Sequence, residues 1–106
     1  MDLRAIQAAA VANKVAKGLN LTDVELEFCL LMAEIGEAFM ARRRGKPDYD
    51  LELADILLFT VGLAEMTGVD LQDAVDRKMR INANRTYRRN DRGVPIKVTT
   101  PPAPRT

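Results

Sequence analysis

Two pairs of carboxylates are the residues of this chain best suited to chemistry. Glu34 and Glu37 lie in the segment "AEIGEA", and Glu52 and Asp55 lie in "LELAD". The members of each pair are three residues apart, so both fall on one face of a helix. Carboxylate oxygens select hard divalent cations, and the two pairs together therefore indicate a Mg²⁺ site, with Mn²⁺ as an alternative ion.

The position of each pair relative to the intervening loop suggests that the two pairs meet. Glu37 lies eight residues before Gly45, and Asp55 lies eight residues after Pro47. If the flanking helices pack antiparallel, both acids lie about 12 Å from the turn, at about 1.5 Å per residue. Converging carboxylates repel one another and lose hydration, and a divalent cation offsets both effects.

The alternative is that these acids are ordinary solvent-facing residues, since pairs with this spacing are common on helices. Asp55 argues against that alternative. The residues that follow it, 56–59, are all apolar, so a helix through this segment has little exposed face for a carboxylate.

A basic stripe follows in the last third of the chain. Lys78, Asn82 and Arg85 recur at helical spacing, and Tyr87 follows close by. Two cations and an amide on one face can bind a polyphosphate beside a metal. The alternative is a solvated basic end of a helix.

Four helices must position these residues. The first is expected over 2–17, ending at Gly18. The second begins after a Thr22 cap and runs to Gly45. The third covers 49–66, and the fourth begins after an Asp70 cap and frays before Gly93. Residues 94–106 are expected to form an extended or disordered tail, or to lie on a partner subunit.

The predicted fold is therefore all-α, an antiparallel four-helix bundle in one helical domain over 1–93, with the tail over 94–106. The second and third helices are apolar around most of their circumference. We expect these faces to drive self-association into a homodimer or homotetramer.

Composition excludes several classes of function. The chain has 106 residues, no histidine and a single cysteine, which excludes histidine triads and ordinary zinc sites. Cys29 lies in an apolar run and is expected to be a small buried hydrophobe.

The net charge of +1 argues against nucleic acid as a partner. No apolar run approaches the length of about 20 residues that spans a membrane, and no signal peptide is visible, so we expect a cytoplasmic protein.

The order of these motifs resembles a known family. Glu-x-x-Glu, a gap of fourteen residues, Glu-x-x-Asp and then "KMRINANRTYRR" is similar to the MazG-like all-α nucleotide pyrophosphohydrolases. That superfamily also includes dimeric dUTPases, dCTP pyrophosphatases and phosphoribosyl-ATP pyrophosphohydrolases. The similarity covers about 15–92. One departure is Ala33, where the family's first motif usually has a second adjacent glutamate, and it leaves the number of metal ions per site open.

The resemblance implies a fold, a site and a reaction. It implies Mg²⁺ ligands and catalytic residues at Glu34, Glu37, Glu52 and Asp55, and nucleotide contacts from Lys78, Asn82, Arg85 and Tyr87. The implied reaction converts a nucleoside triphosphate, ribo or deoxy, into the monophosphate and pyrophosphate. The alternative is a helical nucleic-acid-binding or structural interaction module that uses the basic fourth helix.

Overall fold

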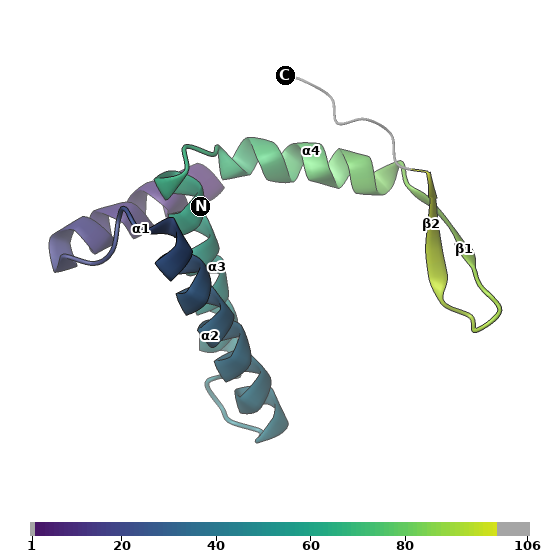
Figure 1. Ribbon diagram of the computed structural model, residues 1–106, viewed down its shortest axis with the longest axis horizontal. Coiled ribbons are helices and arrows are strands. Elements are labelled where there is room, and N and C mark those ends of the chain that lie inside the picture. Colours follow the sequence, from purple (N-terminus) through teal and green to yellow (C-terminus); the bar gives the residue numbers. More distant parts are fainter. Residues whose placement is uncertain (1, 100–106) are drawn as a thin grey trace. The chain divides into compact units, whose positions relative to one another are not determined.

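The structure is a computed structural model that describes residues 2–99. In chain order its elements are α1 (Leu3–Lys17), α2 (Val24–Arg43), α3 (Tyr49–Met66), α4 (Leu71–Ala83), β1 (Thr86–Arg89) and β2 (Pro95–Thr99). The chain divides into two compact units, Met1–Leu71 and Gln72–Thr106, and each is described by itself. The predicted four helices are confirmed (Figure 1).

The first unit is built around α3, which packs against both α1 and α2. The short loop at 44–48 joins α2 to α3, so the two helices run antiparallel and lie side by side (Figure 1). Small side chains of α2 allow a close approach to α3. The buried hydrophobic residues are Ala38, Ala41, Val61, Leu63 and Ala64.

Local hydrogen bonds explain where the first two helices begin. The Asp2 carboxylate accepts a bond of 2.9 Å from the backbone N–H of Ala5 and caps α1. The Asp23 carboxylate accepts one of 3.0 Å from the backbone N–H of Leu26 and caps α2. The predicted cap at Thr22 is therefore wrong by one residue, because Asn20 forms the preceding turn and accepts from the backbone N–H of Asp23.

The second unit contains a correction to the predicted fold. The fourth helix ends at Ala83 and does not continue toward Gly93, because 86–89 and 95–99 form an antiparallel hairpin. Thr and Tyr favour strand, and the Asn90 side chain accepts from the backbone N–H groups of Arg92 and Val94, which closes the turn.

The predicted tail over 94–106 therefore contributes a strand at 95–99, and its residues 100–106 lie outside the described part of the chain. The placing of a domain boundary at Val94 stays a prediction.

Large apolar side chains remain exposed on α2 and α3 of the first unit. Phe28, Met32, Ile35 and Phe39 form one such stripe along α2. Cys29, predicted to be buried, is also exposed, because α2 turns only part of its surface toward α3. Self-association through these faces stays a prediction. None of the described helices is both long and apolar enough to cross a membrane.

Candidate metal and nucleotide site

Three of the predicted acids come together in the first unit. Glu34 and Glu37 lie on α2 and Glu52 lies on α3, and each offers a carboxylate oxygen within 4.8 Å of the others. The antiparallel packing of α2 on α3 brings these residues together. We call this group the acidic cluster.

Two atoms of the acidic cluster suit a bound cation. One carboxylate oxygen of Glu34 and one of Glu52, Oε2 in both, are buried and have no hydrogen-bond partner among the described residues. A buried charged oxygen without a partner costs free energy, and a cation removes that cost. The donor set of carboxylates alone fits Mg²⁺ or Mn²⁺. The geometry thus fits the predicted metal, and the role of these residues as ligands stays a prediction.

The electrostatics of the acidic cluster act most strongly on Glu34. Burial raises the pKa of the Glu34 carboxyl above its ordinary value of 4.5, and the charges of Glu37 and Asp55 raise it further. A hydrogen bond with Glu37 and the charge of Glu52 contribute in the same direction. The metal-free cluster therefore favours holding a proton, which a divalent cation would displace.

Asp55 lies near the acidic cluster without belonging to it. Its charge acts on Glu34, but its oxygens are not part of the group within 4.8 Å. The expectation that α3 leaves it little exposed face is wrong for this chain. Asp55 is exposed, as are Leu57 and Leu58, because α1 and α2 cover only part of the surface of α3 in this stretch.

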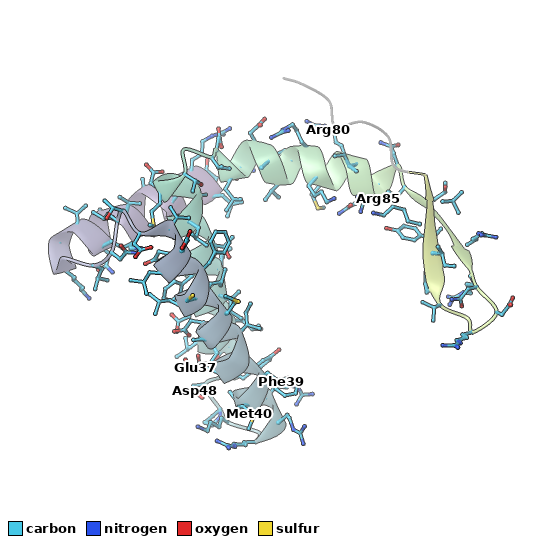
Figure 2. All side chains as sticks on the ribbon, viewed as in Figure 1. Glu37, Phe39, Met40, Asp48, Arg80 and Arg85 are labelled. Carbon is cyan, nitrogen blue, oxygen red and sulfur yellow. The ribbon has the colours of Figure 1, made fainter. Side chains whose placement is uncertain are left out.

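A cavity of about 540 Å³ opens beside the acidic cluster at the loop between α2 and α3. Figure 2 labels Glu37, Met40 and Asp48 in this region. We call it the loop cavity. Its lining residues come from α2, the loop and the start of α3: Ala33, Gly36, Glu37, Met40, Ala41, Arg44, Lys46, Asp48 and Glu52. Ala33 is thus on the wall of the loop cavity, where a larger acid would take up space.

The loop cavity shows functional candidates that the sequence motifs missed. Arg44 and Lys46 place two cations on the same wall as Glu37 and Glu52. Asp48 precedes α3 but makes no capping hydrogen bond with its side chain. The signal in the sequence was the run of charged residues between the two acid pairs, which is also what an ordinary surface loop contains.

The predicted phosphate contacts lie in the second unit. Lys78 and Asn82 are exposed on α4, and Tyr87 is exposed on β1. Arg85 follows the end of the helix (Figure 2). The predicted helical stripe therefore ends at Asn82, because α4 stops at Ala83. The Nε atom of Arg85 is buried and has no hydrogen-bond partner among residues 2–99.

Comparisons with known proteins agree with these features. No family model matches the chain. A dATP/dGTP diphosphohydrolase of cyanophage S-2L is 40% identical over 63 residues, which is 59% of this chain. The chain spans 57% of the length of that curated relative.

A solved structure is similar over nearly the whole chain. The cyanophage S-2L MazG-like pyrophosphohydrolase, bound to dGDP and three catalytic Mn²⁺ ions per active site, matches with a TM-score of 0.71 and 28% identity. The match covers 92% of this chain and 93% of that one. The helical fold of this chain is similar to that MazG-like fold. The resemblance predicted from the sequence is confirmed.

Proposed function

We propose that the chain is a metal-dependent nucleoside triphosphate pyrophosphohydrolase, which releases the nucleoside monophosphate and pyrophosphate. The observation that carries the proposal is the acidic cluster, with oxygens of Glu34, Glu37 and Glu52 within 4.8 Å of one another. Its unpartnered oxygens support a cation as the missing partner. The similarity to a dATP/dGTP diphosphohydrolase and to a pyrophosphohydrolase bound to Mn²⁺ supports the reaction.

The acidic cluster and Asp55 would hold the cation, for which we propose Mg²⁺ with Mn²⁺ as an alternative. When bound, a divalent ion offsets negative charge on the phosphates and acidifies water. Glu34 and Glu52 are the half-buried members, and their position between α2 and α3 restricts their movement. They are best suited to a fixed ligand role.

Glu37 is our candidate for the proton acceptor. Hydrolysis breaks the anhydride between the α- and β-phosphates, the water oxygen becomes bonded to phosphorus, and a water proton must be accepted. Glu37 is exposed and lines the loop cavity, so its carboxylate can reach a water molecule there.

Cations of the chain would bind the triphosphate and the departing pyrophosphate. We assign this role to Lys78 and Arg85, with Asn82 and Tyr87 contacting phosphate or sugar. The unpartnered Nε of Arg85 supports an anionic partner, because an arginine N–H is a donor and binds phosphate oxygens well.

Two cations of the first unit extend this set. Arg44 and Lys46 share the loop cavity with Glu37 and Glu52, which is the side of the acidic cluster open to a ligand. Their charges would offset those of phosphates that reach the loop cavity.

The substrate that we favour is a purine deoxynucleoside triphosphate. The support is the 40% identical relative, which is named for dATP and dGTP. Self-association into a homodimer or homotetramer, and action in the cytoplasm, complete the proposal. The exposed apolar stripe on α2 supports self-association.

The proposal is tested by pyrophosphate release from the four common dNTPs and four NTPs, each with Mg²⁺, with Mn²⁺ and with EDTA. We expect turnover that requires a divalent ion and is lost in Glu52→Gln. The exposed acid Glu25 lies on the same helix outside the acidic cluster, so Glu25→Gln is the matched control and should retain turnover.

Absence of pyrophosphate release with every nucleotide and both ions would overturn the proposal. An affinity for DNA or RNA that falls steeply with salt, and that carboxylate substitutions leave unchanged, would instead support the nucleic-acid-binding module.

A further inference from the structure

The net charge of the chain conceals a separation of charge between its two units. Residues 72–106 contain nine arginines and lysines and three aspartates, whereas residues 1–71 contain seven arginines and lysines and twelve acids. The second unit therefore carries a formal charge of +6 and the first a formal charge of −5. A solvated surface usually mixes both signs, and a field of one sign is typical of a surface that meets a partner of opposite charge.

The hairpin of β1 and β2 presents cations on both of its faces. In the register of the two strands, Arg88 lies opposite Ile96 and Tyr87 lies opposite Lys97 (Figure 1). Residues that lie directly opposite each other share a face of the hairpin, and successive residues of a strand alternate between faces. Arg88 and Lys97 therefore lie on opposite faces, and both residues are exposed.

Two further arginines lie near the turn of the hairpin and differ in their contacts. Arg89 donates from Nη1 to the backbone carbonyl of Gly93 at 2.7 Å and so supports the turn. Arg92 is exposed in the turn. Within residues 2–99, no acid forms an ion pair with Arg88, Arg92 or Lys97, and we call these three residues the hairpin cations.

The arrangement of the hairpin cations fits a partner with two rows of negative charge. A single nucleic-acid strand offers one row of phosphates, whereas the groove of a duplex has a row along each wall. A two-stranded sheet with side chains on both faces is about 10 Å thick, and the major groove of B-DNA is about 12 Å wide and admits such a ribbon. The major groove of duplex RNA is too narrow, so the shape favours duplex DNA.

The acids of the first unit are a poorer match for these cations, because many of them are already engaged. Asp2 and Asp23 cap helices, and Asp70 forms an ion pair. Glu27 is buried and pairs with Lys14 at 2.9 Å. Under the proposed function, a cation at the acidic cluster would reduce the negative charge of this unit further. A polyanion from outside the chain is therefore the better partner.

We propose that the hairpin binds double-stranded DNA, with Arg88, Arg92 and Lys97 in contact with phosphates along the walls of the major groove. Phosphate contacts carry no sequence information, so the binding is expected to be independent of DNA sequence and sensitive to salt. This activity lies beyond the proposed hydrolysis of nucleotides and does not depend on it.

The test is the affinity for a short labelled DNA duplex, measured by fluorescence anisotropy between about 50 and 200 mM KCl. The variant Arg88→Gln/Arg92→Gln/Lys97→Gln keeps Arg89 and its bond to the turn. Since each phosphate contact contributes about 0.9 to the slope of log Kd against log salt, the slope of the variant should be lower by about 2.7. The wild type should thus lose about fortyfold more affinity than the variant over this range. An unchanged slope would overturn the proposal.

The matched control removes the same charge from exposed positions of the first unit, in Lys17→Gln/Arg42→Gln/Arg43→Gln. It should keep the affinity and the slope of the wild type. An equal loss in the control and in the hairpin variant would show that net charge alone determines binding, and would refute a site on the hairpin.

A second hairpin variant separates charge from folding of the hairpin. Arg88→Lys/Arg92→Lys/Lys97→Arg retains all three positive charges and should retain the salt slope of the wild type. A loss of binding in this variant would show that the charges are not what binds, which contradicts the proposal.

Other partners are tested with the same proteins. Duplex RNA and single-stranded DNA of the same sequence should bind more weakly than duplex DNA, and vesicles of phosphatidylcholine and phosphatidylglycerol should not bind. Equal or tighter binding of any of these would overturn the assignment to the DNA major groove. Sedimentation of the glutamine variant should match that of the wild type, and a change would show that the hairpin joins copies of the chain instead.

Pyrophosphate release measured in parallel separates this inference from the proposed function. The hairpin cations have no assigned role in hydrolysis, so their replacement by glutamine should leave turnover unchanged. DNA binding without turnover would refute the proposed function alone. Turnover without DNA binding would refute this inference alone.

Discussion

Replacing Glu34 with glutamine should change the stability of the chain in opposite directions with and without metal. In the metal-free chain, at a pH above the raised pKa of Glu34, this group has lost its proton, and its carboxylate lies within 4.8 Å of the carboxylates of Glu37 and Glu52. Two unit charges at this distance repel by about 0.9 kcal/mol in water and by about 3.5 kcal/mol at an effective dielectric constant of about 20. Because Glu37 is exposed, solvent screening favours the lower figure, and we expect Glu34→Gln to stabilise the metal-free chain by about 1 kcal/mol.

Metal should reverse the order of the two proteins. At a free metal concentration of about a hundred times Kd, binding stabilises the wild-type chain by about 2.7 kcal/mol. The Glu34→Gln variant lacks one metal ligand, so metal binding should stabilise it only a little. For a domain of this size, about 1 kcal/mol corresponds to roughly 4–8 °C in Tm. The variant should therefore melt above the wild type in EDTA and below it in saturating Mn²⁺.

Calorimetric melting in EDTA and in a Mn²⁺ titration measures both effects. Glu25→Gln is the control, because Glu25 is an acid in the first turn of α2 outside the acidic cluster. It should keep the full response to metal and lose a few tenths of a kcal/mol through the helix dipole. If Glu34→Gln melts below the wild type in EDTA, or keeps the wild-type response to Mn²⁺, the assignment of the acidic cluster as a strained metal site is wrong.

Four further outcomes are expected. Asp55→Asn should lower metal-dependent pyrophosphate release at least about tenfold and leave the fold intact, as checked by kinetics and circular dichroism. Since the pKa of Glu34 is raised above 4.5, the proton that it holds stabilises the metal-free fold at low pH. This stabilisation should fall as the pH rises from 4.5 through the raised pKa, and the affinity for Mn²⁺ should rise over the same range. Calorimetry across that pH range measures both effects. Asp23→Ala should cost about 1 kcal/mol in urea unfolding, because the cap of α2 is lost, and an unchanged midpoint would contradict the cap. Arg44→Ala and Lys46→Ala should each raise KM for triphosphates severalfold, and a change confined to kcat would count against phosphate binding in the loop cavity.

The helical part of the fold could be predicted because its signals are local. The third helix was predicted over the residues that α3 occupies, since a loop with proline precedes it and a glycine follows it. The hairpin at 86–99 was missed because its strands have only four and five residues and β1 contains two arginines. The alternation of apolar and polar residues over 96–99 is too short to distinguish a strand from an extended tail. Arginine side chains are compatible both with the last turn of a helix and with an exposed strand, so they do not distinguish between the two structures.

The candidate site could be predicted only where its residues follow helical spacing. The acids of α2 and α3 recur at three residues, so their meeting across the loop could be anticipated. The buried pair of Lys14 and Glu27 could not be anticipated, because the two residues lie on different helices and their meeting depends on how α1 packs in space. The exposure of Asp55 was missed for a related reason, since an apolar sequence around it does not show which apolar residues are buried.

The antiparallel packing of α2 and α3 has a consequence for insertions and deletions in this chain. The acidic cluster depends on the rotational phase of each helix, about 100° per residue. Two residues inserted between Glu52 and Asp55 would place the two carboxylates about 140° apart around α3, whereas one inserted in the loop at 44–48 leaves the phase of both helices unchanged. Length variation among functional relatives should therefore concentrate in the loop. The loop can then vary the size of the cavity it lines while the acids keep their mutual register.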